Sequence, residues 1–282
     1  MKNIMVQGTT SSAGKSLLCT ALCRIFYEDG YKVYPFKSQN MSSVCYVTED
    51  NKKMSNAQAL QAIAAGVEPD PLMNPVLLKP TSDKGSTVII KGIEHSQMEA
   101  REYFEFKNTL RPMIKEVYEK ISSENDIVVL EGAGSPAEIN LKENDIVNMG
   151  MAKMADAPVI LVADIDRGGV FASLYGTVKL LEEDEQKRIK GLVINKFRGD
   201  KTLLESGIKM IEDMLNIPVI ATIPYHPFEL VDEDSLVDYN KKCNSSDQTE
   251  EEREKELQAL SKLVRENMDM EKIYSIVGIE ND

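Results

Sequence analysis

The stretch that decides the fold is Gly8-Thr9-Thr10-Ser11-Ser12-Ala13-Gly14-Lys15-Ser16. It follows an apolar run, Asn3–Gln7, that predicts a strand, and it opens an amphipathic stretch, Lys15–Tyr27, that predicts a helix. Small residues let successive backbone N–H groups surround phosphate oxygens, and the N-terminus of a helix adds partial positive charge. A strand, a Gly-Lys-Ser motif and a helix in this order favour a nucleotide phosphate loop over a plain glycine-rich turn.

Each part of this loop has a predicted task. We expect Lys15 to reach the β- and γ-phosphates and the Ser16 hydroxyl to ligate Mg²⁺. The two glycines are separated by five residues, one more than in the common form of the motif. The residues of this segment that we expect to contact the nucleotide are Thr9, Ser11, Ser12, Ala13, Gly14, Lys15, Ser16 and Leu17.

Two polar residues at the ends of later strands complete the predicted nucleotide site. Glu131 follows the strand predicted over Asp126–Leu130, where ligands bind in open α/β sheets, and it is the candidate Mg²⁺ carboxylate. The alternative is a carboxylate that only faces solvent. Asn195 ends another strand, and its amide suits the edge of adenine, although a capping role remains open. The predicted cofactors are therefore ATP and Mg²⁺.

Short β-branched runs alternate with longer amphipathic stretches along the chain. Apolar strands joined by helices indicate a parallel sheet covered on both faces. The expected fold is therefore α/β, a three-layer parallel sheet flanked by helices, of the P-loop NTPase class. The further predicted strands are 32–36, 87–91, 159–164, 191–195 and 219–223. The further predicted helices are 56–65, 99–122 with an interruption near Pro112, 147–155, 170–181 and 203–215.

Composition excludes several function classes. The chain has 33 Lys and Arg against 46 Asp and Glu, a formal charge of −13, so no nucleic-acid partner is expected. Its longest apolar run, near Ala157–Ala163, is shorter than the roughly 20 residues that cross a bilayer, so no membrane role is expected. The start of the chain does not read as a signal peptide. The cysteines Cys19, Cys23, Cys45 and Cys243 are too few and scattered for a disulfide framework, which favours the reducing cytoplasm.

The composition changes after Phe228, which suggests three parts. Residues 1–228 form the expected P-loop domain, 229–248 an acidic linker, and 249–282 a helical tail. Within the tail, Thr249–Met268 predicts a charged helix with one apolar face. This face indicates a helix that docks on the core, and a coiled-coil partner helix is the alternative.

Several longer strings resemble the ATP-dependent amidase domain of the cobyric acid synthases. The resemblance runs from Met1 to about Val237 and implies the dethiobiotin-synthetase-like branch of P-loop proteins, in which the longer phosphate loop is usual. The strings that carry it are 7–16, 35–41 (PFKSQNM), 57–62 (AQALQA), 73–80 (MNPVLLKP), 131–141 (EGAGSPAEINL), 164–171 (DIDRGGVF), 195–200 (NKFRGD) and 233–236 (EDSL).

The resemblance implies a reaction at side-chain carboxylates of a corrinoid. ATP would phosphorylate a carboxylate of adenosylcobyrinic acid a,c-diamide, and ammonia would displace the phosphate to leave an amide. Because the carboxylate and the γ-phosphate are both anions, the site needs cations and Mg²⁺ between them. The implied catalytic residues are Lys15, Lys37, Asp164, Asp166 and Arg167, and Arg198 is an implied nucleotide contact. The implied substrate contacts are Gln39, Asn40, Lys79, Ser135, Glu138 and Asn140.

The chain also departs from the family pattern. We expect the glutaminase domain that supplies ammonia in this family to be absent, because Leu263–Tyr274 already resembles the C-terminus of the family. Ammonia would then be free or delivered by a separate glutaminase, and a homodimer is an open possibility. Lys53 and Asn56 stand where the family has an acidic residue and an arginine.

These departures keep other functions open. A non-catalytic or regulatory protein that binds ATP and a corrinoid is the main alternative. An ATP-dependent carboxylase resembling dethiobiotin synthetase is another, and a partitioning ATPase of the same superfamily is a third.

Overall fold

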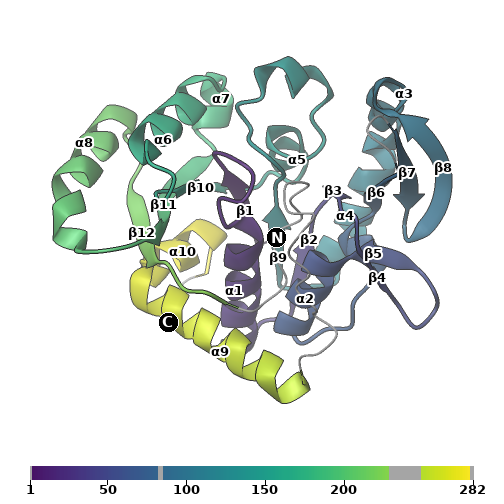
Figure 1. Cartoon of the computed structure of the whole chain (residues 1–282), viewed down its shortest axis with the longest axis horizontal. Helices are drawn as coiled ribbons and strands as arrows, with labels where there is room; N and C mark the ends of the chain where they lie inside the picture. The colour runs from purple at the N-terminus through teal and green to yellow at the C-terminus, as the bar shows by residue number, and fades with distance from the viewer. Residues whose placement is uncertain (1, 82–84, 229–248, 280–282) are drawn as a thin grey trace.

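A six-stranded parallel sheet forms the centre of the molecule (Figure 1). The computed structural model describes residues 2–81, 85–228 and 249–279, so the predicted linker and Cys243 lie outside it. Every neighbouring pair in this sheet is parallel, as expected for strands that are apolar on both faces. Its order is β12 (Val219–Pro224), β11 (Ile189–Phe197), β10 (Val159–Asp164), β1 (Lys2–Gly8), β9 (Ile127–Glu131) and β2 (Val33–Phe36).

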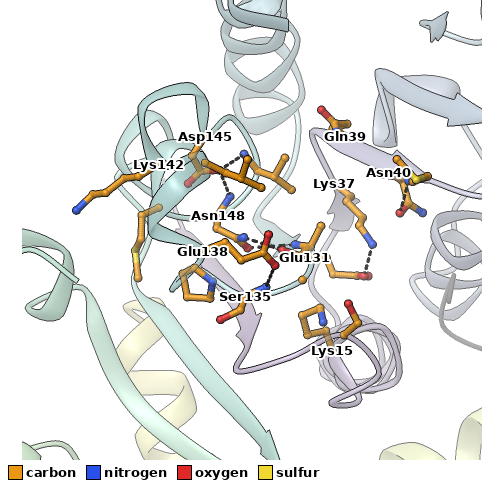
Figure 2. Close-up of a pocket in the computed structure, with 18 of the residues that line it drawn as sticks. Lys15, Lys37, Gln39, Asn40, Glu131, Ser135, Glu138, Lys142, Asp145 and Asn148 are labelled. Carbon is orange, nitrogen blue, oxygen red and sulfur yellow. Dashed lines mark hydrogen bonds and ion pairs between the residues drawn. The ribbon is translucent and has the colours of Figure 1, made fainter. Parts of the chain in front are cut away.

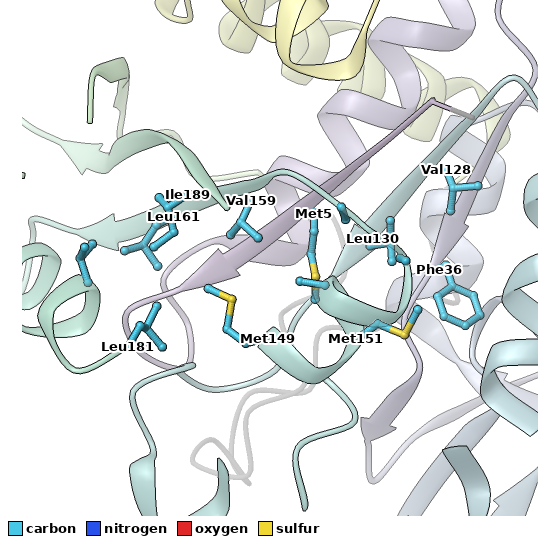
Figure 3. Packing of buried hydrophobic residues seen from close by; sticks show 14 of the residues in the cluster. Met5, Phe36, Val128, Leu130, Met149, Met151, Val159, Leu161, Leu181 and Ile189 are labelled. Atoms are coloured by element: carbon cyan, nitrogen blue, oxygen red, sulfur yellow. The ribbon is translucent and has the colours of Figure 1, made fainter. Parts of the chain in front are cut away.

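Helices cover both faces of this sheet, because side chains alternate along each strand. In β1, Ile4 and Val6 join one buried cluster and Met5 joins the other. Figure 3 shows Met5 in the second cluster with Leu130 and Met149. The predicted three-layer α/β fold is confirmed. The first face carries α1 (Lys15–Glu28), α2 (Asn56–Ala64), α9 (Glu250–Asn267) and α10 (Met270–Val277), and the second carries α4 (Arg111–Ser123), α5 (Met149–Met154), α6 (Val170–Lys179) and α8 (Glu205–Leu215).

A second sheet, which the sequence pattern did not predict, stands beside the first (Figure 1). Only its strand near Thr87–Lys91 was expected. β3 is short and β8 is mostly exposed, so these two lack a clear apolar alternation, whereas β6 has a buried Val-Leu-Leu run that the sequence analysis missed. Its order is β3 (Gln39–Met41), β6 (Val76–Pro80), β7 (Gly85–Ile90) and β8 (Ile93–Glu99), and β4 (Cys45–Val47) pairs with β5 (Lys53–Ser55) in a separate ribbon.

The helical region predicted over 99–122 begins one residue later than expected. Glu99 ends β8, and the helical region begins with α3 (Ala100–Phe106). The expected interruption near Pro112 is present, because a 3₁₀ turn ends at Leu110 and Pro112 lies in the first turn of α4. Proline is tolerated there since its missing N–H would have no helical partner. The remaining short elements are α7 (Glu183–Gln186) and the 3₁₀ turns Pro71–Met73, Lys107–Leu110, Ile139–Asn144 and Lys201–Leu204.

Helices α9 and α10 lie against α1 (Figure 1). Leu257, Leu260 and Val264 supply the apolar contact, as the pattern over 249–268 predicted. Polar contacts add to it, since Arg265 Nη2 lies 2.7 Å from Asp29 Oδ1. Helices α9 and α10 therefore stabilise α1, the helix that follows the phosphate loop. No helix within the described ranges is long and apolar enough to cross a membrane.

Candidate functional site

The phosphate loop lies between the carboxyl end of β1 and the first turn of α1. Gly14 precedes α1 with φ +98°, and a Cβ there would lie 2.0 Å from Asn195 Nδ2. That amide donates a hydrogen bond to the carbonyl oxygen of Ala13 at 2.9 Å. Lys15 is buried and donates to the Thr10 carbonyl oxygen at 3.0 Å. The loop is thus held in a fixed shape, and Gly14 is required both for its backbone conformation and for its closeness to Asn195.

Glu131 ends β9 next to the start of α1 and is 1% exposed. Side-chain donors from three segments of the chain reach its carboxylate. Ser16 Oγ donates to Oε1 at 2.8 Å, and Lys37 Nζ lies 2.6 Å from the same oxygen. Gln61 Nε2 donates to Oε2 at 2.5 Å, and Gln58 Nε2 donates to it at 3.2 Å. Each carboxylate oxygen therefore takes part in two of these contacts.

These contacts keep Glu131 ionised although it is buried. Burial opposes the charge, but the nearby Lys37 ammonium and the hydrogen bonds from Lys37, Gln61 and Ser16 outweigh it and lower the pKa of Glu131. The Glu131 carboxylate thus remains ionised at neutral pH.

The pair of Ser16 and Glu131 fits Mg²⁺ by its chemistry. A hydroxyl and a carboxylate oxygen 2.8 Å apart are hard ligands of the kind Mg²⁺ prefers. The described residues contain no group of three or more His, Cys, Asp or Glu side chains suited to a metal. An ion here would therefore take its remaining ligands from phosphate and water, as Mg²⁺ commonly does at nucleotide sites.

A cavity of about 430 Å³ opens beside this cluster (Figure 2). Its volume lies in the range of small-molecule sites, roughly 300–1,000 Å³. Ten residues predicted for the site line it: Ser11, Ser12, Lys15, Ser16, Lys37, Gln39, Asn40, Glu131, Ser135 and Glu138. The sequence analysis missed other lining residues, among them Met41, Lys107, Leu141, Lys142, Asp145, Asn148 and Met149.

The loop after Glu131 forms one wall of the cavity and is held by Asn148. The Asn148 amide donates to the Ala133 carbonyl oxygen at 2.6 Å, and its own oxygen accepts from the Ala133 N–H at 3.1 Å. Asp145 accepts from the N–H groups of Asn148 and Gly150 at 2.8 Å each. A Cβ on Gly132 would lie 2.3 Å from Asn148 Oδ1, so the glycine permits this contact. No spacing rule links Asn148 to Ala133, which is why the pair was missed.

Other predicted residues gather at the carboxyl ends of β10 and β11 and do not line this cavity. Asp164 pairs with Lys196 at 3.0 Å and with Arg167 at 3.7 Å. Asp166 pairs with Arg198 at 3.0 Å. Lys196 also donates to the Ser12 carbonyl oxygen at 2.6 Å, so this cluster touches the phosphate loop from the opposite side.

Further predicted residues are placed elsewhere. Lys79 lies on β6 opposite Thr87, and Asn140 is exposed in a 3₁₀ turn, so neither is among the residues that line the cavity. Thr9 is buried, and its N–H donates to the Val162 carbonyl oxygen at 2.9 Å.

A second, smaller cavity of about 80 Å³ lies behind the phosphate loop. Leu17 and Asn195 line it together with Leu260, Leu263 and Val264 of α9. Tyr225, His226 and Phe228, which follow β12, complete a mostly apolar wall. The described part of the C-terminal tail thus contributes directly to a cavity next to the phosphate loop.

The two departures from the family pattern lie outside both cavities. Lys53 pairs with Glu94 at 2.5 Å between β5 and β8, and Asn56 opens α2. The residues that contact Glu131 therefore do not include the two positions that differ from the family pattern.

Comparison with known proteins identifies relatives. The profile of the AAA domain family matches residues 2–230. A cobyric acid synthase of Alkaliphilus metalliredigens is 62% identical over 83% of this chain and 46% of its own length. One from Clostridium acetobutylicum is 58% identical over 87% of this chain and 50% of its own, and one from Streptococcus sanguinis is 59% identical over 84% and 47%. The chain spans about half the length of these curated relatives.

Among solved structures, the signal recognition particle receptor FtsY of Elizabethkingia anophelis, in complex with GDP, matches with a TM-score of 0.44. It is 16% identical, and the match covers 79% of this chain and 57% of that chain.

Proposed function

The chain belongs to the AAA domain family and is a homologue of cobyric acid synthases, and on this premise we propose that it amidates side-chain carboxylates of a corrinoid at the expense of ATP. One observation carries the proposal. The phosphate-loop residues Lys15 and Ser16 share a 430 Å³ cavity with the buried Lys37–Glu131 pair and with a separate wall of polar and apolar side chains. Such a cavity can bring a nucleotide and a second substrate together.

The proposed reaction has two steps. A carboxylate oxygen of the corrinoid attacks the γ-phosphorus, the bond from that phosphorus to the β,γ-bridging oxygen breaks, and ADP leaves. Ammonia then attacks the acyl carbon of the acyl phosphate, the carbon–oxygen bond to phosphate breaks, and a proton is lost. The products are an amide, ADP and inorganic phosphate.

The lysines in the cavity bring the two anions of the first step together. Lys15 and Lys37 are both buried, so their charges are poorly screened by water and act strongly on phosphate oxygens. Mg²⁺ bound by Ser16 and Glu131 would neutralise charge on the phosphates and hold them in place. Asn195 and the cavity of Leu17, Tyr225 and Leu263 supply an amide and apolar surface suited to adenine.

The far wall of the cavity suits a large substrate with a carboxylate rim. Met41, Leu141 and Met149 offer apolar contact to a macrocycle, and Gln39 and Ser135 offer hydrogen bonds. Lys107 adds a positive charge that forms no ion pair within the described residues. We assign Lys107 to a side-chain carboxylate of the substrate that is not being amidated.

The ligase domain in this proposal spans residues 1–228, and α9 closes the cavity for the base. Ammonia comes from solution or from a separate glutaminase. Both sources deliver the same nucleophile to the acyl phosphate, so the reaction at the cavity does not depend on the choice.

The proposal is tested by replacing Lys15. Purified wild-type protein and Lys15→Ala are incubated with ATP, Mg²⁺, ammonium and cobyrinic acid a,c-diamide, and ADP and product mass are read together. We expect the variant to lose at least about 100-fold of the ADP release, as when a main charge-stabilising group is removed. Equal turnover by both proteins would refute the assigned site.

A further inference from the structure

Helix α2 presents two buried amides to Glu131, and the reaction described above gives them no task. We propose that Gln61, assisted by Gln58, is a positioning residue that holds the Glu131 carboxylate in the orientation that binds Mg²⁺. The inference rests on the proposed function, because it takes the ion at Ser16 and Glu131 as given.

The two glutamines occupy one face of α2. They are three residues apart, so they lie on neighbouring turns and point the same way. Both side chains are 0% exposed. Ser55 fixes the start of the helix, since its hydroxyl accepts from the Ala57 N–H at 3.2 Å. The amides therefore approach Glu131 from a rigid element.

The two oxygens of the Glu131 carboxylate have different kinds of donor. Oε1 is shared by Ser16 and Lys37, which also line the cavity. Oε2 receives the two amides. An ion or a phosphate can change the contacts at Oε1 while the amides keep Oε2 in place. A carboxylate restrained in this way does not have to be ordered when the ion binds.

The orientation of the Gln61 amide is fixed by charge. Its N–H₂ must face the carboxylate, because the reverse orientation would place two oxygen atoms with negative charge together. Gln61 Oε1 is then left buried with no hydrogen-bond partner among the described residues. Native proteins rarely leave a buried acceptor unpaired without a reason. Mg²⁺ usually keeps several water ligands, and a water of its shell can donate to this oxygen.

Gln58 extends the network toward the substrate side. Its oxygen accepts from Asn40 Nδ2 at 3.3 Å, and Asn40 lines the cavity. Asn40 Nδ2 also donates to Ser55 Oγ at 2.8 Å. One amide thus joins a cavity residue to the metal carboxylate, and we expect a weaker effect from Gln58 because its bond to Glu131 is the longer one.

The test measures metal affinity separately from nucleotide affinity. A fluorescent ATP analogue is bound to the full chain in EDTA and then titrated with Mg²⁺. The variants are Gln61→Ala, Gln58→Ala and Gln61→Met, the last of which keeps the side-chain volume without the amide. Asn125→Ala is the matched control, because it removes an amide bonded to the Ile121 carbonyl oxygen just before β9, at the other end of the strand from Glu131.

We expect Gln61→Ala and Gln61→Met to weaken Mg²⁺ binding about 10- to 100-fold, the usual effect of removing a residue that orients a metal ligand. Nucleotide affinity in EDTA should stay at the wild-type value, and Asn125→Ala should change neither. Unchanged Mg²⁺ affinity in the Gln61 variants, or an equal loss with and without Mg²⁺, would overturn the inference alone. If the wild-type protein itself binds the nucleotide without any effect of Mg²⁺, the proposed function falls as well.

Discussion

Two clusters of charged residues occupy the same edge of the central sheet and differ in how far their ion pairs are exposed to solvent. Glu131 at the end of β9 and Lys37 just after β2 are 1% and 5% exposed and form an ion pair of 2.6 Å. At the ends of β10 and β11, the side chains of Asp166 and Arg198 are 45% and 55% exposed. Helix α2 explains the difference, because it covers the first cluster and supplies two amides to it.

The contrast shows how burial assigns different tasks to similar residues. A buried charge must be paired and hydrogen-bonded, so every member of the first cluster constrains the others. An exposed ion pair contributes little, since water already solvates both partners. The first cluster is therefore a preorganised ionic site. In the second, the exposed Asp166–Arg198 pair is free to rearrange, whereas Asp164 is buried beside Lys196, which contacts the phosphate loop.

Removing one partner from each cluster should give the largest difference. Lys37→Met leaves the buried carboxylate of Glu131 without its cation and should lower the free energy of unfolding by about 3 kcal/mol. Arg198→Met breaks an exposed pair and should cost at most about 1 kcal/mol. Urea unfolding followed by circular dichroism measures both, and equal losses would remove the distinction between the clusters.

The next effect concerns Gly14, where the second region touches the phosphate loop. Gly14→Ala would force a side chain into a left-handed backbone position and against Asn195, so we expect a loss of about 1–3 kcal/mol and much weaker ATP binding. Gly30→Ala is the matched control, because φ is +88° there but nothing lies within 4 Å of the added Cβ. The control should lose about 1 kcal/mol and keep its ATP affinity. A variant at Gly14 that still binds ATP normally would contradict the described geometry.

The Lys107 charge should act on the substrate rather than on the nucleotide. Lys107→Ala is expected to raise the KM for the corrinoid about 10-fold, a cost typical of one lost charged hydrogen bond, and to leave the KM for ATP unchanged. Initial rates at varied concentrations of each substrate separate the two constants. An increase in the KM for ATP instead would place Lys107 at the phosphates.

The buried cluster should also show a characteristic pH dependence. The pKa of Glu131 lies below its ordinary value of 4.5 in the folded state, so its ionised form stabilises the fold fully above that pH. This contribution is lost as the pH falls through the lowered folded-state pKa. The difference in unfolding free energy between the wild type and Glu131→Gln should therefore shrink as the pH falls below 4.5. A difference that grows with acidity would refute the ionised state.

The smallest effect on stability is expected at Arg167. Its side chain is 67% exposed and lies 3.7 Å from Asp164, so Arg167→Ala should change the unfolding free energy by no more than about 0.5 kcal/mol. Any effect on the KM for the corrinoid would then report a role in binding, measured at an unchanged fold.

The central sheet was predictable because its strands are apolar on both faces and are separated by long helices. The element from Val159 to Asp164 has the predicted bounds, and most of the other elements differ by one or two residues. The second sheet was not predictable, because β3 has three residues and β8 is mostly exposed, so neither carries a strong pattern.

The candidate site also contains residues that were predictable from the sequence and residues that were not. The phosphate loop and Glu131 follow from local rules, since each has a fixed position relative to one strand. Gln58, Gln61 and Asn148 act through contacts that join distant segments, and no local rule gives such contacts. Lys79 and Asn140 were expected near the substrate from the resemblance alone, and the structure places them outside the lining of the cavity.

The most direct test of the account measures ADP and product mass together when the protein acts on cobyrinic acid a,c-diamide with ATP, Mg²⁺ and ammonium. We predict that each new amide, seen as the mass change from a hydroxyl to an amino group, is matched by one ADP, and that Lys15→Ala and Glu131→Gln lose both signals. Tight ATP binding with no ADP and no change in corrinoid mass would contradict the assignment of the buried cluster and its cavity to amide synthesis.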